Sequence, residues 1–144
     1  MTDYIVDASV VAKWLIREAD SARARALINP EYFLRAPDLL MAELGNILWK
    51  RAARGDLSAG ESGELLKEFL QNHIDVTVRL LPSRLVIKQA LLIAAAERHS
   101  IYDCIYLALA VQARCVLITA DDLLVKAVRG DMLKPHIISL GDLQ

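Results

Sequence analysis

No stretch of this sequence stays apolar for the roughly 18 residues that a membrane-spanning helix requires. The richest apolar run, residues 91–96, is closed by the polar triplet Glu97-Arg98-His99. The first residues also lack the basic and apolar regions of a secretory signal peptide. We therefore expect a soluble cytoplasmic protein with no membrane partner.

The sequence also has few cysteines and no excess of positive or negative charge. Its two cysteines, Cys104 and Cys115, have the spacing of neither a CxxC motif nor a zinc site, which suits a reducing compartment. The 17 lysines and arginines nearly balance the 18 aspartates and glutamates, and the formal net charge is −1. This balance argues against nucleic-acid binding by bulk electrostatics, but it leaves room for a local basic patch.

The chain has the length and composition of one folded domain. Of its 144 residues, 55% are hydrophobic and 24% are charged, which is typical of a globular protein and not of a disordered one. A chain of this length buries about two-thirds of its unfolded surface. Because no repeat or linker divides it, we expect a single domain over residues 1–144.

Short apolar runs alternate with segments of helical spacing along the chain. The runs predict strands near residues 4–6, 32–36, 76–81, 116–118 and 137–138. Pro37-Asp38, Ser58 and Pro82-Ser83 are expected helix starts, since proline is tolerated at a first helical position and serine is a good cap. The alternation predicts an α/β fold with a parallel sheet and helices on both faces.

The tryptophans and histidines carry little chemical signal in this sequence. Trp14 and Trp49 fall at apolar positions of expected helices, where packing in the core is a better explanation than base stacking. The three histidines, at positions 73, 99 and 136, have no metal-ligand spacing. We therefore assign them no catalytic role.

Two acids directly follow expected strands. Asp7 ends the first apolar run, and Asp121 follows the run at 116–118. The carboxyl ends of parallel strands form the ligand crevice of such folds. Asp7 is equally suited to cap the next helix. In Thr119 to Asp122, the T-x-x-D pattern makes Asp122 the capping-box acid and leaves Asp121 without a capping role.

Two further acids lie on expected helices. Glu43 interrupts an apolar helix, and Asn46 and Lys50 continue its polar strip at helical spacing; a solvated face is the alternative explanation. Asp103 follows Ser100 in an S-x-x-D pattern, so a capping box is the alternative there. Each acid is a weak signal when it is considered alone.

Together the four acids indicate a divalent cation. Four carboxylates in one cleft would repel one another and raise at least one pKa. Mg²⁺ or Mn²⁺ relieves such repulsion and prefers oxygen ligands. A carboxylate-bound metal can generate hydroxide and orient a phosphate, so phosphodiester hydrolysis is the reaction that this chemistry serves best.

Four segments, in this order, resemble a known family. They are IVDASVVAKWL, PDLLMAELGNILWK, YDCIYLALA and LITADDLL, and they are similar to the motifs of PIN-domain ribonucleases, in particular VapC-type toxins of toxin–antitoxin pairs. The likeness covers about Tyr4 to Leu140. It implies a three-layer α/β/α sandwich with a short parallel sheet, and an endoribonuclease that cleaves single-stranded RNA with Mg²⁺ or Mn²⁺. It also implies a homodimer and a VapB-like antitoxin partner.

The resemblance implies a role for each acid. The acidic positions of the family match Asp7, Glu43, Asp103 and Asp121, so we expect a complete catalytic set. We assign the metal to Asp7, Asp103 and Asp121, directly or through water. Glu43 would either complete the ligand shell or help to deprotonate the attacking water.

Other residues are expected to support these acids. Ser9 and Thr119 match small hydroxyl residues that support the metal site of the family. Asp122 is an additional acid beside Asp121, and the motif position favours Asp121 as the one that faces the metal. RNA would also need cations at the edge of the groove. The candidates, each with a solvated charge as its alternative, are Lys13, Arg17, Lys50, Arg51 and Arg98.

Three alternatives stay open at this point. One is a housekeeping PIN nuclease that processes RNA without an antitoxin. Another is a binding module whose acids are only helix caps, which predicts no metal dependence. The third is a receiver-like signalling domain, which also gathers acids at strand ends; Lys134 could serve it, but the acidic pair expected at the first strand is missing.

Overall fold

A five-stranded parallel sheet forms the centre of the protein in the computed structural model, which describes residues 1–144. The strands lie in the order β3-β2-β1-β4-β5, and each neighbouring pair is parallel. Their bounds are β1 Thr2–Val6, β2 Tyr32–Pro37, β3 Val78–Leu81, β4 Val116–Thr119 and β5 Ile137–Ser139. The expected parallel sheet is confirmed.

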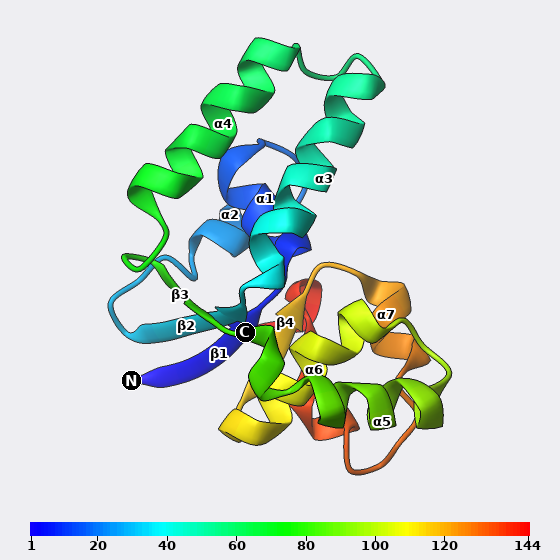
Figure 1. The fold of residues 1–144 in the computed structure, drawn as a ribbon. Helices are drawn as coiled ribbons and strands as arrows, with labels where there is room; N and C mark the ends of the chain where they lie inside the picture. Colours follow the sequence, from blue (N-terminus) through cyan, green and yellow to red (C-terminus); the bar gives the residue numbers. More distant parts are fainter.

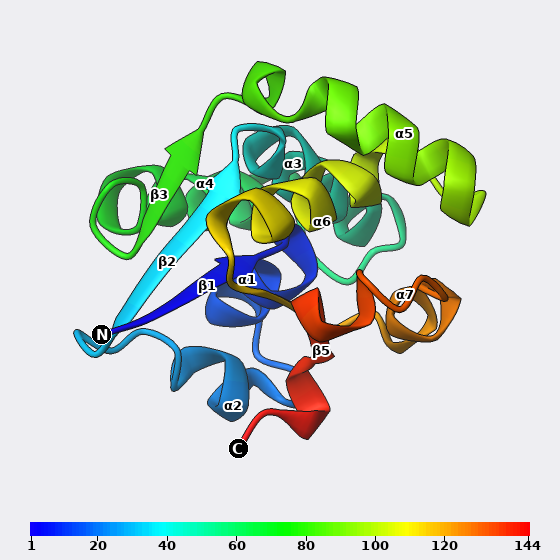
Figure 2. The ribbon, with the colours of Figure 1, turned by 90° about the horizontal axis from the view of Figure 1, so that it is seen from below.

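Helices cover both faces of the sheet. Helices α1 to α4 gather on one side, and α5 and α6 lie on the other (Figures 1 and 2). Helix α6 lies against β1, β2 and β4, while α5 packs on α6. The bounds are α1 Ala8–Leu15, α2 Ser21–Arg25, α3 Leu39–Ala53, α4 Ala59–Asn72, α5 Ile87–Glu97, α6 Ile101–Ala113 and α7 Asp122–Ala127. The three-layer α/β/α prediction is therefore confirmed.

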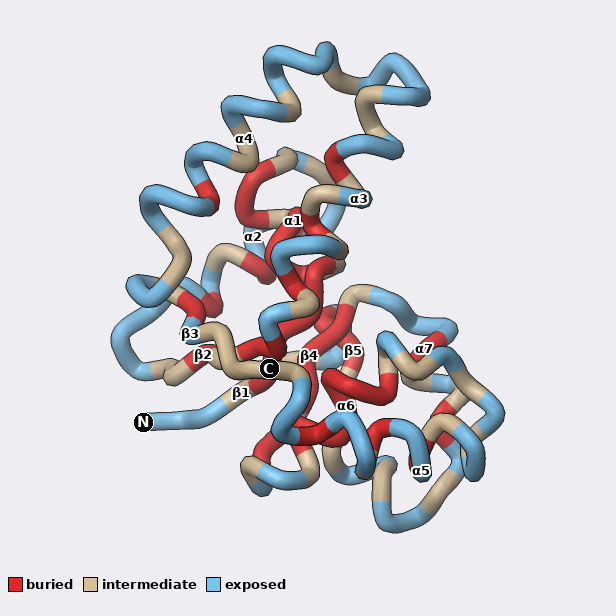
Figure 3. Tube along the Cα trace, in the orientation of Figure 1, coloured by how far each residue is buried: buried red, intermediate tan, exposed pale blue.

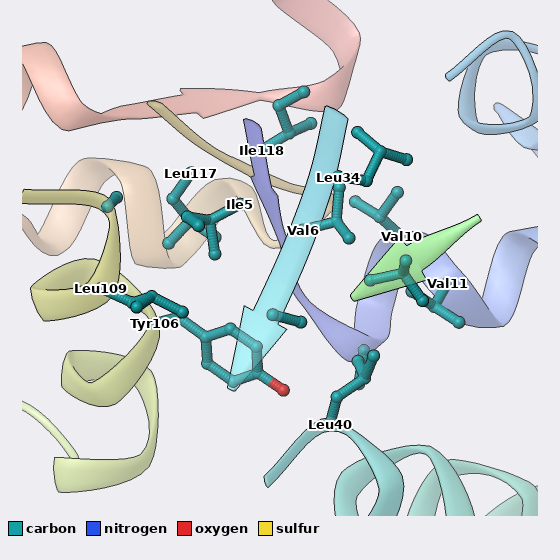
Figure 4. Close-up of a cluster of buried hydrophobic side chains, with 14 of the residues drawn as sticks. Ile5, Val6, Val10, Val11, Leu34, Leu40, Tyr106, Leu109, Leu117 and Ile118 are labelled. Carbon is teal, nitrogen blue, oxygen red and sulfur yellow. The ribbon is translucent and has the colours of Figure 1, made fainter. Parts of the chain in front are cut away.

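The core lies around the two central strands. Ile5 and Val6 of β1 and Leu117 and Ile118 of β4 are fully buried, because helices cover both faces of a parallel sheet. Figure 4 shows side chains of α1, α3 and α6 meeting those of the strands. In Figure 3 the buried segments follow β1, β4 and α6, whereas α4 is mostly exposed. The buried apolar residues form one connected cluster.

Two expected helix starts differ from the structure. Pro37 ends β2 instead of opening a helix: it pairs with Leu81 of β3, and the N–H of Asp38 donates to the carbonyl of Leu81 at 2.8 Å. The expected helix after Pro82 is broken into a 3-10 turn, Ser83–Leu85, and α5. The Ser83 N–H and hydroxyl donate to the Asp38 carboxylate, so Asp38 joins two turns and caps no helix through its side chain.

One tryptophan is buried as expected and the other is not. Trp14 lies in the core, and its indole N–H donates to the Ala24 carbonyl at 2.9 Å. The core prediction for Trp49 is wrong, since 64% of this residue is exposed. Helix α3 buries Leu44 and Leu48, and Trp49 is one position further around the helix, on the face turned to solvent.

The structure also bears on the apolar runs and on the two cysteines noted in the sequence. None of the helices is both long and apolar enough to cross a bilayer. Cys104 and Cys115 are buried, and neither forms a disulfide. Burial raises the pKa of the Cys104 thiol to about 11, with the charges of Asp103 and Glu97 adding to the effect. Both thiols are therefore packing groups in this fold.

The burial of β4 predicts a large cost for truncation there. Leu117→Ala should lower the free energy of unfolding by about 3 kcal/mol, because the change leaves a cavity between two helical layers. The matched control is Leu123→Ala on α7, where the side chain is 77% exposed and the change should stay within about 0.5 kcal/mol. Urea unfolding followed by circular dichroism measures both. Equal effects for the two variants would contradict this packing.

Candidate active site

The order of the strands reverses between β1 and β4. The chain runs outward from β1 through β2 to β3, and then returns to the other side of β1 with β4 and β5. In open α/β sheets, ligands bind at such a switch point, beyond the carboxyl ends of the strands. Val6 is in register with Ile118, so Asp7 and Thr119 leave the sheet side by side.

A cleft of about 450 Å³ opens at this switch point. All four predicted acids line it, and each comes from a different element: Asp7 follows β1, Glu43 lies on α3, Asp103 lies on α6, and Asp121 follows β4. Residues separated by more than a hundred positions in the sequence therefore share one cavity. Strand ends and flanking helices thus supply one acid each to the lining of this cleft.

Asp7 is the most buried of the four, with 7% of the residue exposed. It is the N-cap of α1: one carboxylate oxygen accepts hydrogen bonds from the N–H groups of Ser9 at 3.1 Å and Val10 at 3.3 Å. Burial raises its pKa to about 6, the hydrogen bonds oppose this rise, and the charge of Asp103 adds to it. Asp7 is thus both a cap and a cleft residue, and the two explanations considered above coexist.

Ser9 and Thr119 connect the two strand ends. The Ser9 hydroxyl donates to the Asp7 carboxylate and accepts from the Ala120 N–H at 2.9 Å. It also lies 3.4 Å from the Thr119 hydroxyl, which accepts from the Asp121 N–H at 3.1 Å. This chain of contacts holds the turn after β4 against the first turn of α1. Both residues occupy supporting positions next to the acids, although only Ser9 reaches the cleft wall.

The prediction for the acidic pair after β4 was half right. Asp121 lines the cleft, but it also caps α7, accepting from the N–H groups of Leu123 and Leu124 at 3.0 and 3.1 Å. The expected capping box with Asp122 does not form, because Asp121 and not Thr119 is the N-cap of α7, and the Thr119 hydroxyl accepts from the Asp121 N–H instead of the Asp122 N–H. Asp122 accepts a hydrogen bond from Ser139 on β5 instead, and it lies outside the cleft lining.

The capping box predicted at the start of α6 is also absent. The Ser100 hydroxyl accepts from the Tyr102 N–H at 3.1 Å, whereas the Asp103 carboxylate bonds to Nε2 of His99 at 2.8 Å. Sequence analysis gave His99 no role and missed this contact. The spacing of four residues between the two was the available signal, but His99 lies before the helix begins.

Glu43 is half-buried on the opposite wall. Burial raises the pKa of its carboxyl, the neighbouring Tyr106 hydroxyl opposes the rise, and the charge of Asp103 adds to it. The explanation of Glu43 as part of a solvated face does not hold. Asn46 and Tyr102 also line the cleft and bring an amide and a phenol that the analysis of the acids left out.

The five candidate RNA-binding cations are dispersed. Lys50 lines the acidic cleft. Two others pair with Glu18, since Lys13 lies 3.3 Å from its carboxylate and Arg51 also bonds to it. Arg17 lines a separate groove beside α4, and Arg98 is exposed at the end of α5. Lys50 is therefore the cation best placed for a ligand in this cleft.

The donor set of the cleft fits a hard cation that keeps part of its water. Its acidic side chains offer carboxylate oxygens, and burial, with a smaller effect from the charge of Asp103, raises the pKa of Asp7 and so disfavours its charged form in the absence of a cation. No three His, Cys, Asp or Glu side chains come close enough together to hold an ion by themselves. Ions such as Mg²⁺ commonly take one or two carboxylates and complete their shell with water. The residues present are compatible with that kind of binding.

The fold and the cleft together define an α/β protein with an acidic site at the strand ends, and comparison with known proteins gives its family. Residues 4–129 match the PIN domain. Ribonuclease VapC3 of Pyrobaculum aerophilum is 32% identical over 117 residues, which are 81% of this chain and 88% of that protein. The chain belongs to the PIN-domain family.

Solved structures agree with this assignment at the level of the fold. VapBC2 from Rickettsia felis, bound to a DNA fragment from the promoter, has a TM-score of 0.63 at 10% identity, covering 96% of this chain and 98% of that one. VapC20 of Mycobacterium tuberculosis, described as a Sarcin-Ricin loop cleaving toxin, has a TM-score of 0.58 at 18% identity, covering 90% and 92%.

The burial of Asp7 predicts a pH-dependent stability in the absence of divalent cations. A carboxyl whose pKa rises on folding favours the folded state at low pH, and this contribution is lost as the pH rises through about 6. Asp7→Asn keeps a capping residue but removes the charge. At pH 7.5 it should raise the free energy of unfolding by about 2 kcal/mol, and the gain should shrink toward pH 4.5.

The measurement is urea unfolding at several pH values with a chelator present. Asp131→Asn is the matched control, because that exposed carboxylate is 3.6 Å from Lys134 on the surface and should contribute little at any pH. A gain for Asp7→Asn that does not change with pH would contradict the assigned cause.

Proposed function

We propose that this protein is a metal-dependent endoribonuclease that hydrolyses phosphodiester bonds of single-stranded RNA, and that it is the toxin of a VapBC-type toxin–antitoxin pair. The observation that carries the proposal is the cleft in which Asp7, Glu43, Asp103 and Asp121 meet at the switch point. Support also comes from the 32% identity to Ribonuclease VapC3. We further propose that residues 1–144 act as one domain.

Asp7, Asp103 and Asp121 are proposed to hold Mg²⁺ or Mn²⁺, one or two of them directly and the rest through water. When bound, such an ion orients a phosphate, stabilises the leaving oxygen and lowers the pKa of a water. Ser9 keeps the Asp7 carboxylate in place through its hydroxyl. His99 does the same for Asp103, as outer partners of metal-binding carboxylates commonly do.

Glu43 has one of two roles on the α3 wall. It either completes the ligand set or accepts the proton of the attacking water. Its raised pKa brings it closer to the range where a carboxylate is an effective general base at neutral pH. Lys50, one turn of α3 beyond Asn46 and on the same wall, is proposed to attract a phosphate of the RNA.

A VapB-like antitoxin and a second copy of the chain are the proposed protein partners, with VapBC2 among the similar structures in support. A cytoplasmic location suits the two buried free thiols. The second candidate is a housekeeping PIN nuclease without an antitoxin. Growth arrest on expression, absent for the inactive Asp103→Asn variant, favours the toxin; RNase activity without arrest favours the housekeeping enzyme.

Removing one carboxylate tests the proposed chemistry. Asp103→Asn should lower cleavage of a fluorescent single-stranded RNA in Mg²⁺ or Mn²⁺ by at least a hundredfold, on the order expected for a residue that acts on the transition state. A chelator should abolish cleavage by the wild type. Asp131→Asn, a surface carboxylate on a turn, serves as the control and should keep full activity. Full metal-dependent activity of Asp103→Asn would contradict the assignment.

The place of Lys50 in the cleft predicts a salt-dependent effect on RNA binding. Lys50→Ala should weaken binding to a single-stranded RNA and should reduce the slope of log affinity against log salt by about 0.7, the value for one phosphate contact. Lys67→Ala on α4, an exposed lysine outside the cleft lining, is the control. Fluorescence anisotropy at three salt concentrations measures both. Identical slopes for the two variants and the wild type would exclude this contact.

A further inference from the structure

One buried polar group beneath the cleft is not explained by packing. Tyr106 lies on α6, three residues after Asp103, and only 1% of it is exposed. Its hydroxyl has no hydrogen-bond partner within the protein. An unpaired buried hydroxyl destabilises the folded state, and phenylalanine would fill the same space without that cost. The oxygen therefore calls for a reason other than core packing.

The hydroxyl points from α6 toward α3. Figure 4 shows the ring of Tyr106 extending from α6 with its oxygen turned to Leu40 on α3. Glu43 is three residues after Leu40, on the next turn of that helix. Burial raises the pKa of Tyr106 far above its ordinary value, and Glu43, Asp7 and Asp103 raise it further. The hydroxyl is therefore a permanent donor that faces the floor of the acidic cleft.

Glu43 is the carboxylate that the hydroxyl reaches most strongly. After burial, Glu43 raises the pKa of Tyr106 more than Asp7 or Asp103 does. In the other direction, Tyr106 is the one side chain that lowers the pKa of Glu43. Asp7 and Asp103 already have partners of their own in Ser9 and His99. Among these three acids, Glu43 is thus the one whose carboxylate has no other side-chain partner.

We propose that Tyr106 is a positioning residue for Glu43, whose carboxylate it holds toward the cleft by donating a hydrogen bond from the core side. The hydroxyl has no hydrogen-bond partner in this structure, so the proposal requires the half-buried Glu43 side chain to turn toward it. The proposal rests on the proposed function in one respect, namely that Glu43 acts in the cleft. Tyr106 itself touches no substrate in this account.

The test is Tyr106→Phe, which removes the single oxygen atom. In the metal-free protein, ¹³C NMR of the side-chain carboxyl carbons follows the titration of Glu43. Loss of a donor to the ionised form should move its midpoint upward, by up to about one pH unit. Tyr4→Phe is the matched control: Tyr4 is partly buried in the middle of β1, 5.6 Å from Tyr32 between ring centres, and the change should leave the midpoint unchanged.

Kinetics supply the second readout. Tyr106→Phe should lower kcat for RNA cleavage by about tenfold with KM within about twofold, because the bond orients a reacting group without binding substrate. In a Glu43→Gln background the same change should have little further effect. The NMR titration needs neither metal nor nuclease activity, so it still tests the Tyr106–Glu43 contact if the protein cleaves no RNA.

An unchanged Glu43 midpoint in Tyr106→Phe would overturn the proposal, whatever the change in unfolding temperature. A tenfold loss of kcat that persists in the Glu43→Gln background would also overturn it, because the hydroxyl would then act on something other than Glu43. A shifted midpoint together with a kcat loss confined to the Glu43-containing protein would support it.

Discussion

The structure depends on one buried carboxylate at the end of the central strand. Asp7 caps α1, accepts a hydrogen bond from Ser9, and faces the cleft from a buried position. Two first-turn N–H groups stabilise its charge, while burial and the neighbouring Asp103 oppose it. The result is a carboxylate that is fixed in direction but incompletely neutralised. A cation in the cleft would remove that imbalance, so the cap and the site depend on the same carboxylate.

The sheet topology determines which other residues meet Asp7. Because β4 returns beside β1 after the chain has built β2 and β3, the turn after β4 brings Asp121 to the same edge. Helices α3 and α6 lie on opposite sides of the sheet (Figure 1), and each extends an acid over that edge. The small hydroxyls of Ser9 and Thr119 let the two strand ends approach closely. Core packing in this fold thus sets the spacing of the carboxylates.

Sequence alone predicted the parts that follow from local periodicity. The parallel sheet, the two helical layers and the meeting of the four acids were predictable, since acids after apolar strands converge in a parallel sheet. Sequence alone did not predict whether Asp121 or Asp122 caps α7. That choice depends on which of the two residues the Thr119 and Ser139 hydroxyls contact. Trp49 was misplaced because periodicity does not say which face of a long helix meets the core. His99 and Tyr106 acquire their neighbours only when α6 docks.

The central claim is that these carboxylates act as one cation site. The most direct test is thermal unfolding across a Mn²⁺ titration, for the wild type and for Asp7→Asn. A ligand that binds only the folded state adds about 2.7 kcal/mol at a hundredfold excess over its dissociation constant. The account predicts such a rise for the wild type and its loss in Asp7→Asn. No rise in the wild type, or an equal rise in both proteins, would contradict it and leave the acids as helix caps.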